Sequence, residues 1–213
     1  MSSTDKDATC MMMKEQYTAP GYNAQFATEH QVILAYGVFS DRNDSHLMKP
    51  MIEEIQERTG KKPQIVPADA GYGNKRTYRY LKQQKITAFI PYNNYNKERI
   101  ERNKDLYQPP QSYNTELEKY KFQQRLRLAS EKGKQLMKRR REDIEPTIGD
   151  IKRNMGFRRF HLRGKYKCEI ELGLVSIGHN LKKIKQWVKN LTNWDNGLLK
   201  RQELGKVLGY VAV

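Results

Sequence analysis

The strands and helices of this chain can be assigned outward from one stretch, Gln64-Ile65-Val66-Pro67-Ala68-Asp69-Ala70-Gly71-Tyr72-Gly73. An apolar run bounded by turn residues is typical of a short buried strand, which here ends at Asp69. The glycines that follow let the backbone turn sharply and leave the carboxylate accessible. Because open α/β sheets bind ligands at this end of a strand, Asp69 is a candidate functional residue. The alternative interpretation is that its side chain only caps the next element.

Strand and helix patterns alternate on both sides of this stretch, which indicates an α/β fold with some parallel pairing. Residues Glu29 and His30 mark the turn of an antiparallel pair, and Asp44 or Ser45 is suited to cap a helix. The expected elements are strands at 22–29 and 31–39, a helix at 47–59, a strand at 64–68, a helix at 74–84 and a strand at 86–90.

The flanking regions are more polar. Residues 1–20 predict a loop or an incomplete element, and residues 92–130 predict an irregular insertion with Pro109-Pro110 in its middle. Helix is expected from Ser130 on, and residues 190–213 are expected to form a tail. Two apolar stripes with helical spacing follow: Ile144, Ile148, Ile151 and Met155, and then Ile170, Leu174, Ile177, Leu181, Ile184 and Val188.

The charge balance points to a polyanionic partner. The 213 residues include 40 Lys and Arg and carry a formal net charge of +16, which favours binding to nucleic acid. Most of the surplus lies between Lys121 and Lys167. No apolar run is long enough to span a membrane, and the two cysteines, Cys10 and Cys168, do not make a disulfide framework. We therefore expect a cytoplasmic protein with reduced thiols and no membrane partner.

A second carboxylate lies in the most basic region. Glu145 flanks the first apolar stripe, and Pro146 suits the first turn of a helix, which would place Glu145 near a helix N-terminus. Arg141 and Lys152 are spaced to share a face with Glu145. The alternative is an ordinary surface helix with ion pairs four residues apart. Further basic residues suited to phosphate contacts, or to a solvated helix face, are Lys138, Arg139, Arg140, Arg158 and Arg159.

Several motifs together resemble the DDE transposases of bacterial insertion sequences, over roughly residues 4–189. They occur in the family's order, which makes the resemblance specific although no single motif is decisive. The motifs are Pro20-Gly21-Tyr22-Asn23-Ala24-Gln25, Ala68-Asp69-Ala70-Gly71-Tyr72-Gly73, Pro91-Tyr92-Asn93, Ile144-Glu145-Pro146-Thr147-Ile148-Gly149-Asp150-Ile151-Lys152, Gly156-Phe157-Arg158-Arg159-Phe160, Arg163-Gly164 and His179-Asn180-Leu181-Lys182-Lys183.

The resemblance implies a ribonuclease H-like fold, a mixed sheet flanked by helices, in a catalytic domain at 1–189. It implies three acidic ligands for two Mg²⁺ or Mn²⁺ ions, with Asp69 as the second ligand and Glu145 as the third. The implied reaction is metal-dependent DNA cleavage and strand transfer. Arg141 and Lys152 would contact DNA phosphates near the cut. The implied partners are element ends and target DNA, in a nucleoid-associated bacterial protein.

One departure from the family's pattern concerns the first acidic ligand, which would lie upstream of Thr4. We therefore expect a fold that is incomplete at its N-terminus, in a truncated or split transposase. Asp5 and Asp7 are the candidate replacements for the first ligand. A catalytically inactive DNA-binding remnant and a basic RNA-binding protein are the alternatives. A second copy of the chain and a full-length transposase are the candidate protein partners.

Overall fold

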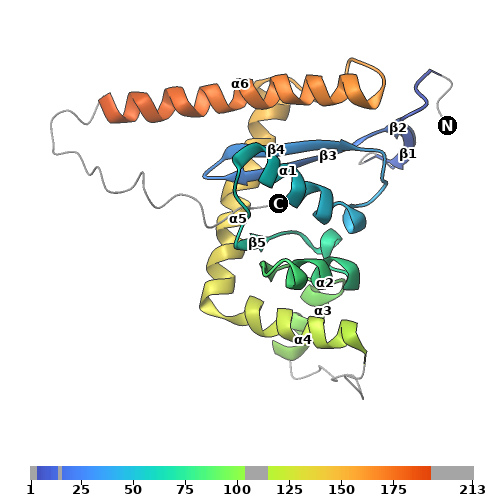
Figure 1. The fold of residues 1–213 in the computed structure, drawn as a ribbon, viewed down its shortest axis with the longest axis vertical. Coiled ribbons are helices and arrows are strands. Elements are labelled where there is room, and N and C mark those ends of the chain that lie inside the picture. The colour runs from blue at the N-terminus through green and yellow to red at the C-terminus, as the bar shows by residue number, and fades with distance from the viewer. Residues whose placement is uncertain (1–3, 14–15, 104–114, 193–213) are drawn as a thin grey trace.

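The computed structural model describes residues 4–13, 16–103 and 115–192, which form a mixed α/β protein (Figure 1). Helices and strands alternate in its first part, and its last part is helical. The elements are β1 Thr9–Met12, β2 Thr18–Gly21, β3 Asn23–Glu29, β4 Val32–Phe39, η1 Asp44–His46, α1 Met48–Thr59, β5 Ile65–Pro67, η2 Ala70–Tyr72, α2 Lys75–Gln83, β6 Thr87–Phe89, α3 Tyr95–Asn103, α4 Glu116–Ala129, α5 Glu131–Gly149, the π-helical turn η3 Asp150–Asn154, and α6 Lys165–Thr192.

The α/β fold class is confirmed, but the described strands form two-stranded sheets rather than the single mixed sheet that was expected. In the part of the chain that the structure describes, β1 pairs with β2 and β3 with β4, both antiparallel, while β5 and β6 are parallel. The predicted 22–29 and 31–39 pair and the predicted parallel pairing are therefore present. The β1–β2 pair lies where the sequence predicted a loop or an incomplete element.

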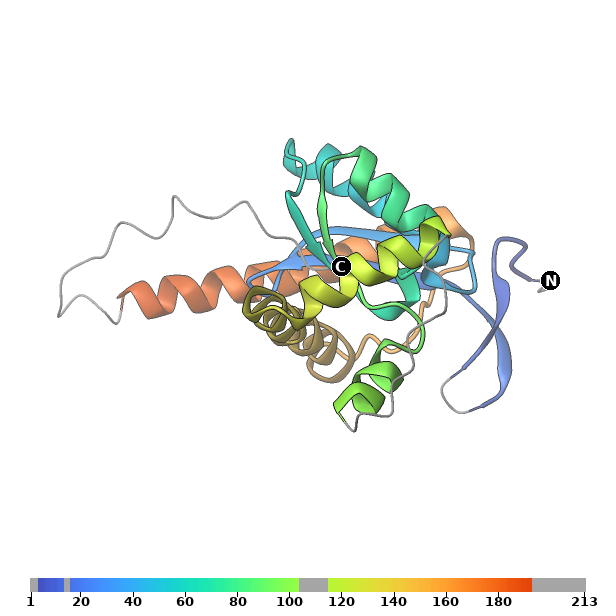
Figure 2. The same cartoon turned by 90° about the horizontal axis from the view of Figure 1, so that it is seen from below.

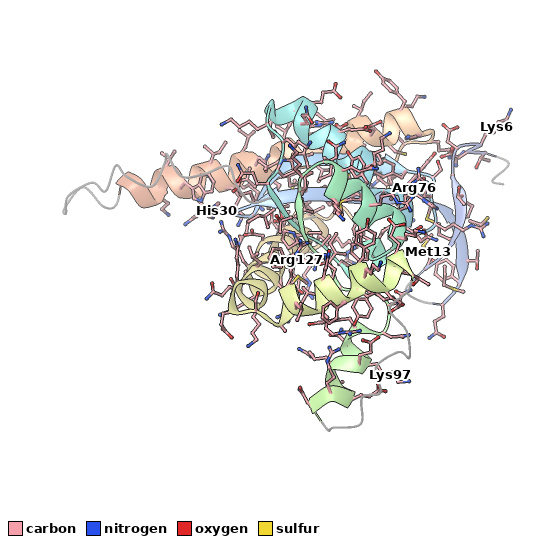
Figure 3. The ribbon with its side chains drawn as sticks, turned by 60° about the horizontal axis from the view of Figure 1, so that its bottom comes forward. Lys6, Met13, His30, Arg76, Lys97 and Arg127 are labelled. Carbon is pink, nitrogen blue, oxygen red and sulfur yellow. The ribbon has the colours of Figure 1, made fainter. Side chains whose placement is uncertain are left out.

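The β3–β4 hairpin closes in a two-residue turn. His30 and Gln31 both have positive φ angles, 52° and 63°, as the twist-matched turn of a tight hairpin requires. Glu29 pairs with Val32 across this turn, so the turn lies one residue later than the predicted Glu29-His30. Figure 3 shows His30 at the end of the hairpin that lies farthest from Lys6 and Met13.

The two faces of β4 pack against different helices. Ala35 and Phe39 belong to the main core with α1, whereas Tyr36 and Val38 contact buried residues of α6. Successive side chains of a strand point to opposite faces, so β4 separates two apolar clusters. Figure 1 shows α6 along the outer side of the hairpin and α5 running from α4 toward α6. The main core continues to β5, α2 and β6 (Figure 2).

The region expected to be an irregular insertion contains two helices, α3 and α4. Tyr120 of α4 packs in the main core, and the Gln124 side chain accepts the backbone N–H of Ile90. Helix formation there was not expected because the segment has few regularly spaced apolar residues. The Pro109-Pro110 pair and most of the predicted tail lie outside the described residues. No helix in the described ranges combines the length and apolarity needed to cross a membrane.

Candidate functional site

Asp69 lies at the carboxyl end of β5, where the sequence placed it. Its Oδ1 accepts the backbone N–H of Gly71 at 3.0 Å and so caps η2. The other oxygen is available for contacts, since the side chain is 54% exposed. A Cβ at Gly73 would lie 2.1 Å from the Pro91 carbonyl oxygen, so glycine is needed where the exits of β5 and β6 meet. Asp69 therefore caps η2 with one carboxylate oxygen, while its side chain stays accessible to other groups.

Helix α5 brings a cation to this carboxylate. The Arg140 guanidinium lies 3.5 Å from Asp69 Oδ2, and the Arg140 side chain is only 16% exposed. The sequence suits Arg140 to DNA phosphates or to a solvated helix face, but the Arg140 side chain contacts a carboxylate of the same chain. This contact joins the carboxyl end of β5 to the helix that carries Glu145.

A network of polar side chains lies on the other side of η2. The amides of Asn23 and Gln25 each donate to Asp44 Oδ1 at 2.8 Å, and the Tyr72 hydroxyl donates to Gln25 Oε1. Burial raises the pKa of Tyr72, and the charges of Asp44 and Asp69 raise it further, against the effect of Arg140. The Tyr72 hydroxyl therefore stays protonated and donates its hydrogen bond. Asp44 and Asp69 are both close enough to raise its pKa.

The contacts of Asp44 with the Asn23 and Gln25 amides were not predicted. The sequence predicts Asp44 or Ser45 as a helix cap, but Asn43 caps η1 and no side-chain cap precedes α1. Because a carboxylate in a turn is a common cap, the pattern favoured that interpretation. Nothing in the local sequence shows that the Asn23 and Gln25 amides come from a strand 19 to 21 positions earlier. Only the fold brings them together.

Glu145 lies on the exposed side of α5, and the prediction that it lies near a helix N-terminus is wrong. Helix α5 begins at Glu131, capped by Ser130, and Pro146 lies inside it near its end at Gly149. Proline removes the N–H that would bond to the Glu142 carbonyl. The Gln31 Nε2 of the hairpin donates to that carbonyl instead, at 3.0 Å. The tertiary contact thus compensates for a proline inside the helix.

The predicted phosphate-binding residues divide into two groups. Arg139 and Arg140 are partly buried, and Arg139 Nη2 lies 2.7 Å from His30 Nε2. Five others are exposed, on α5, on η3 and on the turn after Gly156: Lys138, Arg141, Lys152, Arg158 and Arg159. Lys138 Nζ lies 3.8 Å from Glu142 Oε1 on the same helix. The exposed five therefore keep the accessibility that phosphate contacts need.

The hairpin turn is held between α5 and α6 by buried polar contacts. His179 is fully buried, with Nδ1 2.8 Å from Asp150 Oδ2 and Nε2 2.8 Å from the Gln31 carbonyl oxygen. Partial burial acts to raise the pKa of Asp150, but hydrogen bonds from Lys182, Asn154 and His179 outweigh it and hold the pKa well below its usual value. The His179 ring thus links the Asp150 carboxylate to the backbone of the hairpin turn. We call these residues, Gln31, Asp150 and His179, the hairpin clamp.

Asp5 and Asp7, the candidate replacements for the first ligand, bind the start of α6 instead. The Tyr22 hydroxyl and the Gly164 backbone N–H donate to the Asp5 carboxylate, at 2.8 and 3.0 Å. Asp7 Oδ2 accepts the backbone N–H of Lys165 at 3.0 Å. The Gly164 contact lowers the pKa of Asp5. These contacts give both carboxylates a structural role at the helix N-terminus.

Comparison with protein families gives a match to the transposase DDE domain over residues 5–181. The chain belongs to the transposase DDE domain family. The match covers most of the chain and includes both Asp69 and Glu145, so the resemblance seen in the sequence is confirmed. Comparison with curated proteins and with solved structures gave no match.

Membership of the transposase family carries general expectations about the site. The chain has a transposase role, the family's partner is DNA, and its members use divalent metals. Carboxylate oxygens are the donors that magnesium and manganese prefer, so Asp69 and Glu145 fit such an ion by chemistry. Within the described ranges, no three or more His, Cys, Asp or Glu side chains gather into a metal-binding group. The residues that the structure describes therefore do not supply a three-residue ligand set on their own.

Proposed function

We propose that this chain acts in DNA transposition by metal-dependent DNA cleavage and strand transfer, with Asp69 and Glu145 as metal ligands. One observation carries the proposal. An accessible carboxylate at the carboxyl end of β5 contacts Arg140 of α5, the helix that also carries Glu145 and Arg141. The contact holds α5 next to the carboxyl end of β5, and the proposal adds that Glu145, five residues further along α5, completes the ligand pair.

The residues around Asp69 would position it for this role. The Gly71 N–H fixes one carboxylate oxygen, which leaves the other to meet a cation. Arg140 neutralises that oxygen in the absence of an ion, and would yield to a divalent cation because two charges compete better for one carboxylate. When bound, the metal supplies Lewis-acid stabilisation of the phosphodiester oxygens. Arg141 and Lys152 are exposed and would hold the flanking phosphates in register.

A non-catalytic DNA-binding role is the second candidate. It needs only the five exposed basic residues named above and no metal, and the exposure of all five side chains favours it. The basic RNA-binding alternative loses support from the family match. The two remaining candidates differ in one respect, which is whether Asp69 and Glu145 share an ion.

Iron-mediated backbone cleavage tests this difference. Fe²⁺ replaces Mg²⁺ in oxygen-ligand sites and, with ascorbate and peroxide, cuts the chain next to the bound ion. A shared ion predicts two cuts, near residues 69 and 145, both abolished by Asp69→Asn and by Glu145→Gln. Glu142→Gln is the matched control, since Glu142 is exposed on the same helix. Cutting near one residue alone, or cutting unchanged by Asp69→Asn, would contradict the proposal.

A plasmid assay separates catalysis from binding. We expect the chain to nick supercoiled plasmid with Mn²⁺, and the Asp69→Asn variant to bind the plasmid without nicking it. Retardation of the plasmid by the wild-type chain with no nicking would instead support the DNA-binding candidate.

A further inference from the structure

Helix α6 exposes a continuous apolar stripe on the side that faces away from the rest of the protein. The six stripe side chains are each between 45% and 65% exposed. Figure 1 shows α6 along the outer edge, with the other elements on one side of it. We call this stripe the α6 seam: Ile170, Leu174, Ile177, Leu181, Ile184 and Val188.

Other residues of α6 provide its packing. The buried face consists of Cys168, Leu172, Ser176 and His179. Gly173 lies against Tyr36 of β4, because a Cβ there would meet the Tyr36 hydroxyl oxygen at 2.3 Å. The helix is therefore already anchored without the seam. An exposed apolar stripe of this length is typical of an interaction surface.

The spacing of the seam favours another helix as its occupant. Its residues follow one another by four and three positions in strict alternation, which is the repeat of a coiled coil and is narrower than the stripe of an ordinary core-facing helix. With Leu174 and Leu181 at a positions and Ile170, Ile177 and Ile184 at d positions, the seam is about 27 Å long, since a helix rises about 1.5 Å per residue. A groove-shaped or flat partner would not require this repeat.

The seam is complementary to itself when two copies run antiparallel. The a and d positions then meet in three kinds of layer, each formed twice: Ile170 with Val188, Leu174 with Ile184, and Ile177 with Leu181 of the other copy. Every layer joins two bulky apolar side chains. The arrangement leaves no seam residue without a partner among the six.

Charge favours the antiparallel orientation over the parallel one. Residues 165–177 of α6 contain two lysines and two glutamates, whereas residues 178–189 contain four lysines and no acid. Antiparallel pairing places Glu171 opposite Lys185 at the flanking e positions. The Glu171 carboxylate also accepts the backbone N–H groups of His161 and Leu162, and the side chain is 14% exposed, so it contributes a negative charge at this flank rather than a free side chain. Parallel pairing would instead bring the lysines together.

From these observations we infer that the chain forms an antiparallel dimer through the α6 seam, with a second copy as the occupant. The inference depends on α6 alone and not on the metal chemistry proposed above. The apolar layers supply the affinity, and the charges at the flanks fix the orientation. Isologous contact of one surface with itself gives the closed two-fold symmetry of most soluble dimers.

Sedimentation velocity of the full chain, freed of nucleic acid, tests the inference. We expect a species of about 50 kDa, twice the 25.1 kDa of one chain. The double variant Ile177→Glu/Leu181→Glu removes both central layers and should raise the dissociation constant by about a hundredfold or more. Its far-UV circular dichroism should stay unchanged, because both residues are exposed. Leu126→Glu is the matched control, with an exposed leucine on α4, and should still dimerise.

Cross-linking tests the orientation. In a Cys10→Ser background, the Ile177→Cys and Leu181→Cys variants should form a disulfide with each other faster than either forms one with itself. Preferential self-linking of Leu181→Cys would show parallel pairing and overturn the inference. A dimer that survives Ile177→Glu/Leu181→Glu would place the interface elsewhere and also overturn it. So would a monomer whose Ile177→Cys thiol resists alkylation, because the seam would then be covered by its own chain.

Discussion

Helices α5 and α6 carry apolar stripes with the same spacing, yet they bury them in opposite ways. In the α5 stripe, which extends into η3, Ile144 is 9% and Ile151 is 3% exposed. In α6 the stripe faces outward, and a different set of side chains, Cys168, Leu172, Ser176 and His179, contacts the body of the protein. The offsets from the first stripe residue are identical over the first four positions. Spacing therefore predicts a helix but not which of its faces will pack.

The partner surface explains the difference. Helix α6 lies on the face of β4 that presents Tyr36 and Val38, with Phe26 of β3 beside them. Bulky strand side chains need small residues opposite them, and Gly173 and Ser176 provide that space. In α5, Ile144 packs with Leu136 and Ile148 of the same helix in a separate apolar cluster. For α6, the volume of the facing strand side chains, rather than the helix's own pattern, selects the buried side.

The largest predicted effect comes from breaking the clamp that holds the two helices together. Asp150→Ala removes the carboxylate that bonds to the buried His179, to Lys182 and to Asn154, and losing three hydrogen bonds of about 1–1.5 kcal/mol each costs about 3–4.5 kcal/mol. We expect a loss of that size in the free energy of unfolding, measured by urea denaturation. Asp41→Asn, at an exposed position, should change the value by less than about 0.5 kcal/mol.

The same clamp predicts a dependence of stability on acid. Because the folded pKa of Asp150 lies below its unfolded value, its contribution is present above about pH 4 and is lost as the pH falls further. Wild-type stability should therefore decrease below about pH 4, by at most about 1.4 kcal/mol per pH unit from this group. The decrease should be smaller in Asp150→Ala. Equal slopes for the two proteins would show that the clamp carries no such linkage.

A pair of isoleucine truncations tests the contrast between the stripes directly. Ile151→Ala removes a buried side chain and should lower the free energy of unfolding by about 2–4 kcal/mol. Ile177→Ala removes an exposed one and should change it by less than about 0.5 kcal/mol when measured at concentrations too low for dimers. Similar losses for both variants would mean that the α6 seam packs inside the monomer.

Two glycines of α6 give a smaller and sharper test. Gly173→Ala places a methyl group 2.3 Å from the Tyr36 hydroxyl oxygen, and the Arg58 guanidinium stacks 3.9 Å from the centre of that ring, which restrains it. We expect a loss of about 1–3 kcal/mol, partly restored by Tyr36→Phe. Gly178→Ala meets only the end of the Met155 side chain, at 3.0 Å, so it should be neutral or slightly stabilising. Thermal melts of the four proteins measure both effects.

The smallest change is expected from the exposed cations. Arg141→Ala and Lys152→Ala should leave the melting temperature unchanged, because both side chains are exposed. If each contacts one phosphate, each substitution should reduce the slope of log affinity against log salt by about 0.9 on duplex DNA. Fluorescence anisotropy with a labelled duplex measures this slope. An unchanged slope in both variants would remove these residues from the proposed DNA contact.

The parts of the site that depend on local sequence were predicted well. The strand that ends at Asp69, the hairpin turn and the helix from Ser130 follow from apolar runs, turn residues and a cap within a few positions of one another. The contacts that surround Asp69 were not predicted. Arg140 was assigned to DNA, and Asp44 was assigned to a cap, because each partner lies far away in the chain. The roles of Asp69 and Glu145 as metal ligands stay predictions.

The sequence by itself determined the transposase DDE domain family, the α/β order of elements and the helical spacing of both stripes, since motifs and periodicity are local properties of the chain. Only the tertiary structure decided that Pro146 lies inside α5, because the compensating donor, Gln31, comes from a distant hairpin. It also decided that the α6 stripe faces outward. The buried side of a helix depends on the volume and shape of the surface it meets, and no stretch of sequence contains both surfaces.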